Sequence, residues 1–236
     1  MFEWNDILIL GDSFVGHRDL ETDWPQLLTC KLTGLPFDEK RIPRGHGFNG
    51  SSWWSVRNRL HEELKIKKPK VLILTHTEPQ RIPSDNNYNL NPGSVENPDW
   101  HKQLNTNEQN EVDVNAGLAP REVLLAGQQY YKYLISIDYH LWAQEKWYEE
   151  LDNLISTSDI DYVIHMHCFD PWKNKKLHEF KNSITFNKPI WQVSDDSKKW
   201  SIHNRNHFTL NNNKKMMEVM YSCVEKYNHG FRDLKL

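Results

Sequence analysis

Three short, largely apolar runs lie far apart along this chain, and they constrain its fold more than any other feature. They are ILIL at residues 7–10, VLIL at residues 71–74 and YVIHM at residues 162–166, of which the last contains one histidine. Continuous apolar runs of this length are typical of strands that are buried on both faces of a parallel sheet. Because segments with helical spacing lie between them, the sequence predicts an α/β fold, a three-layer sandwich with a central, mostly parallel five-stranded sheet.

The other two strands are predicted at residues 41–44 and 189–193. Asp23 and either Ser51 or Ser52 are expected to cap the first two helices. The four predicted helical segments cover residues 24–32, 53–65, 120–155 with a break near 137–138, and 210–227.

The third helical segment is rich in aromatic residues. Its spacing predicts that Tyr131, Leu134, Ile135 and Trp142 face the core. In the closing segment, the residues spaced for one buried face are Met216, Val219, Met220, Cys223 and Tyr227.

Residues 84–118 show neither a continuous apolar run nor helical spacing of apolar residues. They contain nine Asn, two Pro and two Gly without apolar periodicity. A structureless connection of this length is uncommon inside a compact domain unless it is functional or disordered. We therefore expect a single domain over residues 1–236, with a polar, Asn-rich insertion at about 84–118 beside the functional site.

Charge and cysteine usage argue against several classes of partner. The chain has 29 basic and 32 acidic residues and a formal net charge of -3, which gives no electrostatic reason to expect nucleic acid or an anionic membrane as a partner. Cys30, Cys168 and Cys223 are an odd set without metal-like spacing, as expected for reduced thiols. No leader or membrane-spanning pattern is present, so the sequence predicts a cytoplasmic protein.

The first apolar run leads directly into Gly11, Asp12 and Ser13. Asp and Ser are favoured turn residues, so a simple turn is one interpretation of this stretch. The other is a nucleophilic serine at the carboxyl end of a buried strand, where Gly11 supplies the backbone freedom for a sharp turn.

Four short motifs, taken in chain order, resemble the blocks of the SGNH/GDSL hydrolases. They are GDSF after the first run, FNGSS after the predicted second strand, THTE after VLIL, and NRNHFTLNNNKKM before the last helix. The resemblance covers nearly the whole chain and implies a flavodoxin-like fold and esterase activity without a cofactor. In that family the first block supplies a serine nucleophile, and the second and third blocks supply an oxyanion-hole Gly and Asn. The last block supplies an Asp and, three residues later, the catalytic His.

Carried onto this chain, the resemblance implies that Ser13 is the nucleophile, that its own N–H and Gly50 serve the oxyanion hole, and that His207 is the base. Two positions depart from the family pattern. Thr77 stands where the oxyanion-hole Asn is expected, and Asn204 stands where the family has the Asp that orients the base. A Ser-His dyad is therefore the minimum expectation.

Several residues are candidates for the two missing roles. Asn49 is a possible substitute donor to the oxyanion hole. Asp195 or the adjacent Asp196, or Glu78 from the neighbouring strand end, are alternatives for orienting the base. Asp12, His76 and His167 are expected as further orienting groups or as walls of the site.

His165 and His167 alternate along one predicted strand, so both point to the same side. Together with His76 they suggest a metal site as an alternative. Buried strand-end histidines more often pack or form hydrogen bonds, so we expect no metal.

The sequence thus predicts a serine ester hydrolase that removes small acyl groups, with an acylated carbohydrate or another small ester as substrate. Its alternative is a catalytically degenerate SGNH-fold module that binds a ligand or has a structural role. Compact proteins of this type also resemble ones encoded by tailed phages, for which a virion or host-cell location is expected. The oligomeric state stays open.

Overall fold

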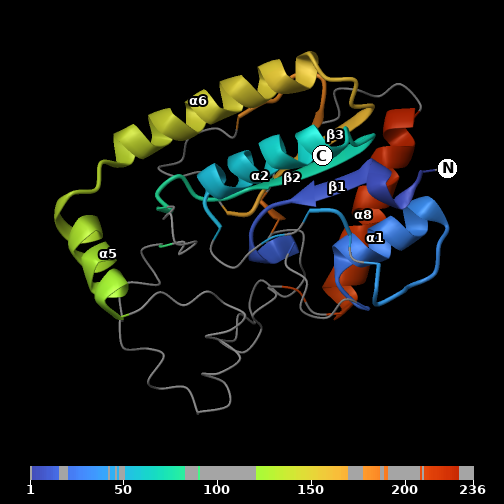
Figure 1. The fold of residues 1–236 in the computed structure, drawn as a ribbon, viewed down its shortest axis with the longest axis horizontal. Coiled ribbons are helices and arrows are strands. Elements are labelled where there is room, and N and C mark those ends of the chain that lie inside the picture. Colours follow the sequence, from blue (N-terminus) through green and yellow to red (C-terminus); the bar gives the residue numbers. More distant parts are fainter. Residues whose placement is uncertain are drawn as a thin grey trace, which may run out of the picture.

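The computed structural model describes residues 2–15, 21–41, 43–45, 47, 51–82, 90, 121–169, 178–186, 189–190, 208 and 210–228. Within these residues the fold is α/β, with five α-helices and a parallel sheet of four strands in the spatial order β1-β2-β3-β4 (Figure 1). The strands are β1 (Ile7–Leu10), β2 (Val71–His76), β3 (Tyr162–His167) and β4 (Ile184–Thr185). The predicted α/β class and its three long apolar strands are confirmed.

The register of the strands determines which segments meet. Leu10 pairs with Leu74 on β2, and His76 pairs with His167 on β3. Because parallel strands in register end at the same edge of the sheet, the residues that follow β1, β2 and β3 lie together at its carboxyl edge. This edge therefore receives the Gly-Asp-Ser turn and the start of the Thr77–Glu78 segment.

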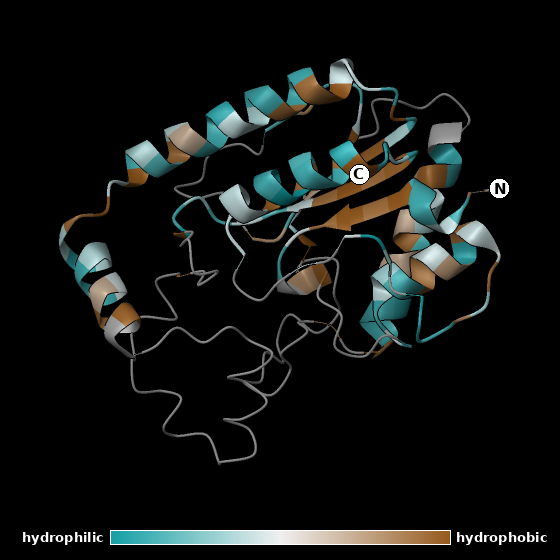
Figure 2. Ribbon diagram, viewed as in Figure 1, coloured by the Kyte–Doolittle hydropathy of each residue, from teal (hydrophilic) through white to brown (hydrophobic). Residues whose placement is uncertain are grey.

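Helices cover both faces of the sheet. Helices α1 (Trp24–Thr33) and α8 (Leu210–Asn228) lie side by side against one face, and α2 (Trp53–Ile66) and α6 (Ile137–Ser156) pack against the other. Alternation along β1 sends Ile7 and Ile9 to the first core and Leu8 and Leu10 to the second. The strands are almost entirely buried because helices cover both faces, and β1 is apolar along its whole length (Figure 2).

The first two helices begin where the sequence predicts, but only one has the predicted cap. The Ser52 hydroxyl accepts the Ser55 N–H at 3.2 Å at the start of α2. Asp23 occupies the N-cap position of α1 but makes no side-chain capping hydrogen bond. Asn213 Oδ1 of α8 accepts the Trp24 N–H at 3.1 Å instead, so a tertiary contact replaces the expected local cap.

Two predicted strands differ from the structure. Of the described residues 41, 43 and 44, only Arg44 forms a parallel bridge, to Leu8, and Gly47 forms a second one to Gly11. Among the described residues the last strand is β4, in which Ile184 is fully buried and pairs with Ile164. Pro189 and Ile190 do not belong to a strand, and residues 191–193 lie outside the described ranges.

The long helical segment breaks earlier than predicted. Helix α5 (Arg121–Tyr133) ends before residues 134–136, and α6 begins where the Ser136 hydroxyl accepts the Tyr139 N–H at 3.3 Å. Helical periodicity does not continue across this break. The prediction that Leu134 and Trp142 face the core is therefore wrong, since their side chains are 72% and 58% exposed. The buried face of α6 is formed by Trp147, Tyr148, Leu151 and Ile155.

Gly11, directly after β1, packs closely against Thr75 of β2. A Cβ at this position would lie 1.6 Å from Thr75 Oγ1 and 2.7 Å from Val15 Cγ2. We expect Gly11→Ala to destabilise the protein by about 3 kcal/mol, because the neighbours are a strand side chain and a packed valine. Urea unfolding measures this loss.

Gly34→Ala is the matched control. Gly34 has φ of +70°, but no heavy atom lies within 4 Å of the position that a Cβ would occupy, so only the backbone preference of about 1 kcal/mol is lost. Equal losses in the two variants would contradict the steric role of Gly11.

Candidate active site

The Gly-Asp-Ser motif forms a tight turn at the carboxyl end of β1. Ser13 is the first residue of η2, a 3-10 turn over Ser13–Val15. The Phe14 N–H donates to Asp12 Oδ1 at 3.0 Å, and the Val15 N–H donates to the Asp12 carbonyl at 3.0 Å. Asp12 therefore fixes the backbone on the carboxyl side of Ser13 through both its side chain and its carbonyl.

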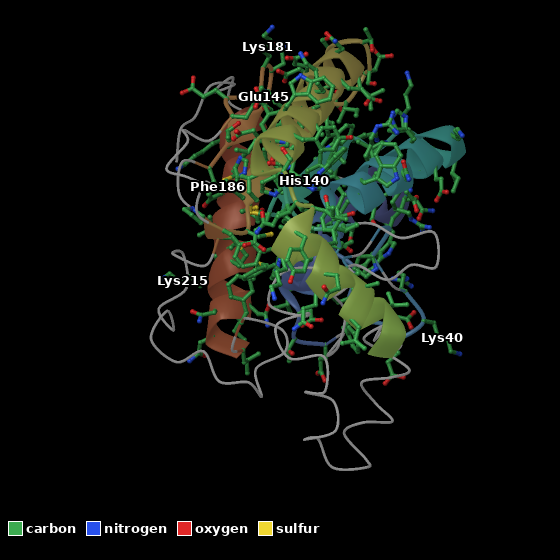
Figure 3. The ribbon with its side chains drawn as sticks, turned by 90° about the vertical axis from the view of Figure 1, so that its left-hand side faces the viewer. Lys40, His140, Glu145, Lys181, Phe186 and Lys215 are labelled. Carbon is green, nitrogen blue, oxygen red and sulfur yellow. The ribbon has the colours of Figure 1, made fainter. Side chains whose placement is uncertain are left out.

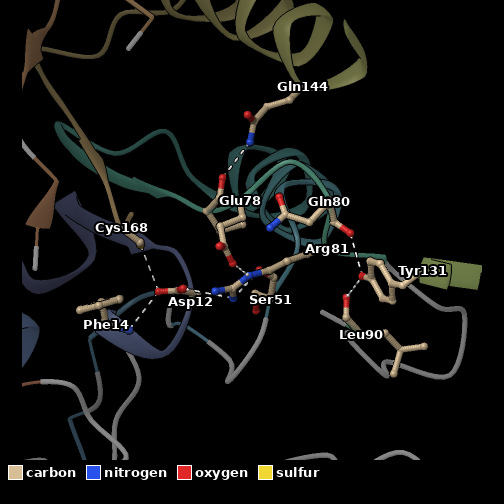
Figure 4. Close-up of polar contacts among 11 residues, drawn as sticks. Asp12, Phe14, Ser51, Glu78, Gln80, Arg81, Leu90, Tyr131, Gln144 and Cys168 are labelled. Carbon is tan, nitrogen blue, oxygen red and sulfur yellow. Dashed lines mark hydrogen bonds and ion pairs between the residues drawn. The ribbon is translucent and has the colours of Figure 1, made fainter. Parts of the chain in front are cut away.

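The Asp12 carboxylate is fully buried and has partners on both oxygens. Its Oδ1 also accepts the Cys168 S–H at 3.2 Å, and its Oδ2 lies 3.2 Å from Arg81 Nη1 in an ion pair without hydrogen-bond alignment (Figure 4). Burial and the adjacent carboxylate raise the pKa of the Cys168 thiol well above its usual range, so the thiol stays protonated and remains a donor. These contacts compensate a charge that is costly to bury alone.

Arg81 lies at the centre of this network. The sequence gives no signal for this role beyond a basic residue in the loop after the THTE motif. Its side chain is 6% exposed. Besides Asp12, its guanidinium contacts Glu78 Oε2 at 3.3 Å and the Ser51 carbonyl at 3.4 Å, and it lies 5.0 Å from the centre of the Phe169 ring. Arg81 thus joins the segments that follow β1 and β2 to the start of α2 (Figure 4).

Thr77, at the position of the expected oxyanion-hole Asn, is buried directly after β2. Its carbonyl accepts a hydrogen bond from Gln144 Nε2 on α6 at 2.8 Å. Its hydroxyl is buried and has no hydrogen-bond partner within the described residues. A buried unpaired hydroxyl is costly, and such groups require an explanation in terms of structure or function.

The loop that carries Arg81 is anchored at both ends. Ile82 and Leu90 exchange backbone hydrogen bonds of 2.8 and 3.0 Å in an antiparallel bridge. The Tyr131 hydroxyl of α5 lies 2.8 Å from the carbonyls of both Gln80 and Leu90. Burial raises the pKa of Tyr131, so this phenol stays protonated as the donor. The backbone that presents Arg81 is therefore held from two sides.

His165 and His167 point to the same side of β3, as predicted, and they meet His76 of β2 there. The His165 ring is stacked 3.7 Å from the Phe180 ring, and His76 Nε2 lies 2.9 Å from His165 Nδ1. The Tyr148 ring of α6 packs edge-on against His76. Burial lowers the pKa of His76 and His165 well below the usual range and that of His167 to about 3, so all three rings are neutral at pH 7.

The histidine cluster does not have the arrangement of a metal centre. Among the described residues, no group of three His, Cys, Asp or Glu side chains is placed to hold a metal ion. The nearby His178 contacts Glu145 at 2.9 Å and Asp152 at 3.3 Å on α6, in the region of Figure 3 that carries the Glu145 label. We interpret these rings as packed, hydrogen-bonded components of the core beneath α6.

Six predicted site residues lie outside the described ranges, as does the side chain of Ser13. Those residues are Asn49, Gly50, Asp195, Asp196, Asn204 and His207. Residues next to two of them are described. Ser51 follows Gly50 and is bound by Arg81, and Phe208 follows His207 and packs edge-on against Phe14, with ring centres 5.5 Å apart.

Comparison with known proteins gives no family assignment. No protein-family model matches this chain, and neither the curated proteins nor the solved structures contain a match. Within the described residues, no helix is long and apolar enough to cross a bilayer.

The buried histidines generate a prediction about pH. Their pKa values are lower in the folded protein than the ordinary 6.5, so below pH 6.5 the unfolded chain binds more protons. Their contribution to stability is complete above pH 6.5 and is lost as the pH falls from 6.5 toward 3. Each histidine contributes a slope of up to about 1.4 kcal/mol per pH unit.

Urea unfolding between pH 5 and 7.5 measures this slope. His140, whose pKa burial also lowers, adds to it in the same direction. In His167→Leu, unfolding should take up about one proton fewer, so the slope should decrease by up to about 1.4 kcal/mol per pH unit. A free energy of unfolding that stays constant over this range would contradict the burial of neutral histidines.

Proposed function

We propose that this protein is a serine ester hydrolase of the SGNH type, which removes small acyl groups from an acylated carbohydrate or another small ester. Ser13 is the nucleophile and His207 is the general base. The proposal includes a cytoplasmic location and no cofactor, nucleic-acid or membrane partner. It rests on the resemblance of the four motifs together with the geometry at the carboxyl edge of the sheet.

The contact between Phe14 and Phe208 is the observation that carries the proposal. Phe14 directly follows Ser13, and Phe208 directly follows His207, although 194 positions separate the two phenylalanines in the sequence. Their rings pack edge-on with centres 5.5 Å apart. Because adjacent residues are joined by one peptide unit, this contact brings the backbone next to the nucleophile near the backbone next to the base.

The oxyanion hole is proposed at the same edge. Its donors are the N–H groups of Ser13 and Gly50, and Thr77 Oγ1 or the side chain of Asn49 stands in for the family's Asn. The buried Thr77 hydroxyl without a partner supports this role, because a hydroxyl with no partner of its own among the described residues is free to donate to a bound oxyanion.

The finer architecture belongs to the same proposal. The parallel bridges from Leu8 to Arg44 and from Gly11 to Gly47 support a fifth strand beside β1, on the side away from β2. The resulting strand order is flavodoxin-like and places the change of direction between β1 and β2, where open α/β sheets bind their ligands. Ser13 and Thr77 follow these two strands.

The proposed reaction has two halves. Ser13 Oγ attacks the acyl carbonyl carbon while His207 takes the hydroxyl proton, and the ester C–O bond then breaks as His207 protonates the leaving alcohol. Water, deprotonated by His207, next attacks the acyl-enzyme and releases the carboxylic acid and free Ser13. The candidates to orient His207 remain Asn204, Asp195 or Asp196, and Glu78. Of these, the Glu78 carboxylate is paired with Arg81.

The second candidate function is a degenerate SGNH-fold module that binds a ligand without turnover. The burial of Thr77 favours it, since its short side chain is 5% exposed and its carbonyl is already bound to Gln144. Loss of one oxyanion-hole donor typically reduces turnover about 100- to 1000-fold rather than abolishing it, so a weak contribution from Thr77 is compatible with the proposed hydrolase.

An organophosphonate probe tests the nucleophile directly. We expect the probe to label Ser13, and Ser13→Ala and His207→Ala each to reduce hydrolysis of a short-chain aryl ester by at least about 1000-fold. The double variant should lose little more than either single variant, because both residues serve one proton transfer. Mass spectrometry of the labelled peptide and initial rates are the measurements.

Ser156→Ala is the control, since Ser156 lies at the exposed end of α6 and should leave labelling and rate unchanged. Rates are also expected to be insensitive to EDTA. Absence of labelling and hydrolysis with acetyl, butyryl and acetylated-sugar esters would favour the binding module.

Asn204→Asp tests the missing carboxylate. If a neutral group orients His207, a carboxylate at this position should stabilise the imidazolium and raise the turnover number about 10-fold. If another acid already fills the role, the two carboxylates repel each other and the rate stays constant or falls. Steady-state kinetics of the parent and the variant distinguish these cases.

A further inference from the structure

Arg81 binds the neighbours of all three residues proposed to form the oxyanion hole. Its partners are Asp12 at 3.2 Å, the Ser51 carbonyl at 3.4 Å and Glu78 at 3.3 Å. Each partner is adjacent in sequence to one member of the hole: Asp12 precedes Ser13, Ser51 follows Gly50, and Glu78 follows Thr77. One guanidinium group therefore joins the three segments whose relative placement the hole requires (Figure 4).

We propose that Arg81 is the positioning residue that sets the spacing of these three segments and thereby aligns the oxyanion hole. The proposal rests on the proposed function, because it assigns to Arg81 a role in the same reaction. Arg81 acts through its partners and does not itself contact the reacting atoms.

The chemistry of the side chain suits this role. A guanidinium is planar, always charged, and carries donors in a fixed fork, so it binds several acceptors in one geometry. Its Nε faces Glu78 while Nη1 faces both Asp12 and Ser51. The Phe169 ring covers the group at 5.0 Å. Lysine presents a single flexible ammonium and lacks a second donor position for Glu78.

The contact with Asp12 transmits the position of Arg81 to the nucleophile turn. The Asp12 carboxylate that faces Arg81 also accepts the Phe14 N–H at 3.0 Å, immediately after Ser13. Without the guanidinium this fully buried carboxylate would lose its only cationic partner among the described residues and would reorient. This change would weaken its hold on the turn at Ser13.

Oxyanion-hole donors work only when they lie about 2.7–3.1 Å from the developing charge. A displacement of about 1 Å reduces turnover on the order of 100-fold, whereas binding of the ground-state ester depends on it much less. Loss of Arg81 should therefore act on kcat more than on KM.

The test compares Arg81→Met with Arg44→Met. Arg44 is also a buried arginine, with its Nε 2.8 Å from Glu63, but it bridges to Leu8 toward the amino-terminal end of β1. Both variants remove a buried ion pair, so both should lower Tm. We expect Arg81→Met to reduce kcat about 100-fold per folded molecule with KM within a factor of about two, and Arg44→Met to leave both constants unchanged.

Two further variants separate positioning from general destabilisation. Arg81→Lys should recover only part of kcat, because it keeps the charge near Asp12 and loses the fork. In Arg81→Ala, millimolar guanidinium ion should restore part of kcat, whereas the same concentration of methylammonium should restore less. Unchanged kcat in Arg81→Met would overturn the proposal and leave the hydrolase assignment intact.

A readout without substrate distinguishes failure of this inference from failure of the proposed function. Hydrogen exchange of the Phe14 amide, which donates to Asp12, should be at least about 10-fold faster in Arg81→Met than in Arg44→Met. If the native protein neither hydrolyses esters nor reacts with a phosphonate, the proposed function fails, and this exchange rate alone decides whether Arg81 holds the turn. Equal exchange in the two variants would overturn the role of Arg81.

Discussion

A buried negative charge at the end of the first strand is the constraint on which the rest of this edge depends. Asp12 is fully buried, so its carboxylate requires donors and a cation from other parts of the chain. Phe14 supplies a backbone N–H, Cys168 a thiol and Arg81 a guanidinium. These groups come from the turn after β1, the end of β3 and the loop after β2. Compensation of one charge therefore fixes three strand ends relative to one another.

The carboxyl edge of the sheet also carries a cluster of neutral histidines, His76, His165 and His167, which strand alternation directs to one side. Cys168, directly after β3, lies in the core beneath α1 and α8, whereas His165 of β3 packs with His76 and Phe180 on the side of α6. Adjacent strand positions face opposite sides of a sheet, so the ionic network and the neutral histidines are kept apart. The histidines are buried and uncharged because their surroundings are aromatic, while Asp12 stays compensated by a cation. At the carboxyl edge of the sheet, the charged Asp12–Arg81 network and the neutral histidines therefore lie on opposite sides.

The sequence predicted those parts of the fold that local patterns determine. Continuous apolar runs identified β1, β2 and β3, and Ser52 marked the start of α2, because burial and capping act over a few residues. It missed β4, a two-residue strand whose existence depends on pairing with Ile164, and it placed Trp142 in the core because periodicity across a helix break carries no information. Arg81 was also missed, since its role arises only from contacts made across the fold.

If the proposed SGNH-type function holds, the contacts of Arg81 account for Thr77 at the position where that family has an asparagine. An asparagine in the third block reaches an oxyanion with a long side chain, whereas Thr77 has only a hydroxyl next to the backbone and tolerates less error in the placement of its strand end. Gly11 removes the side chain that would otherwise meet Thr75 and allows β1 and β2 to approach closely at this point. Arg81 then joins the segment of Thr77 to that of Ser13 through Glu78 and Asp12. In the proposed hydrolase, the short Thr77 donor is therefore accompanied by ionic contacts that hold its segment to the Ser13 turn.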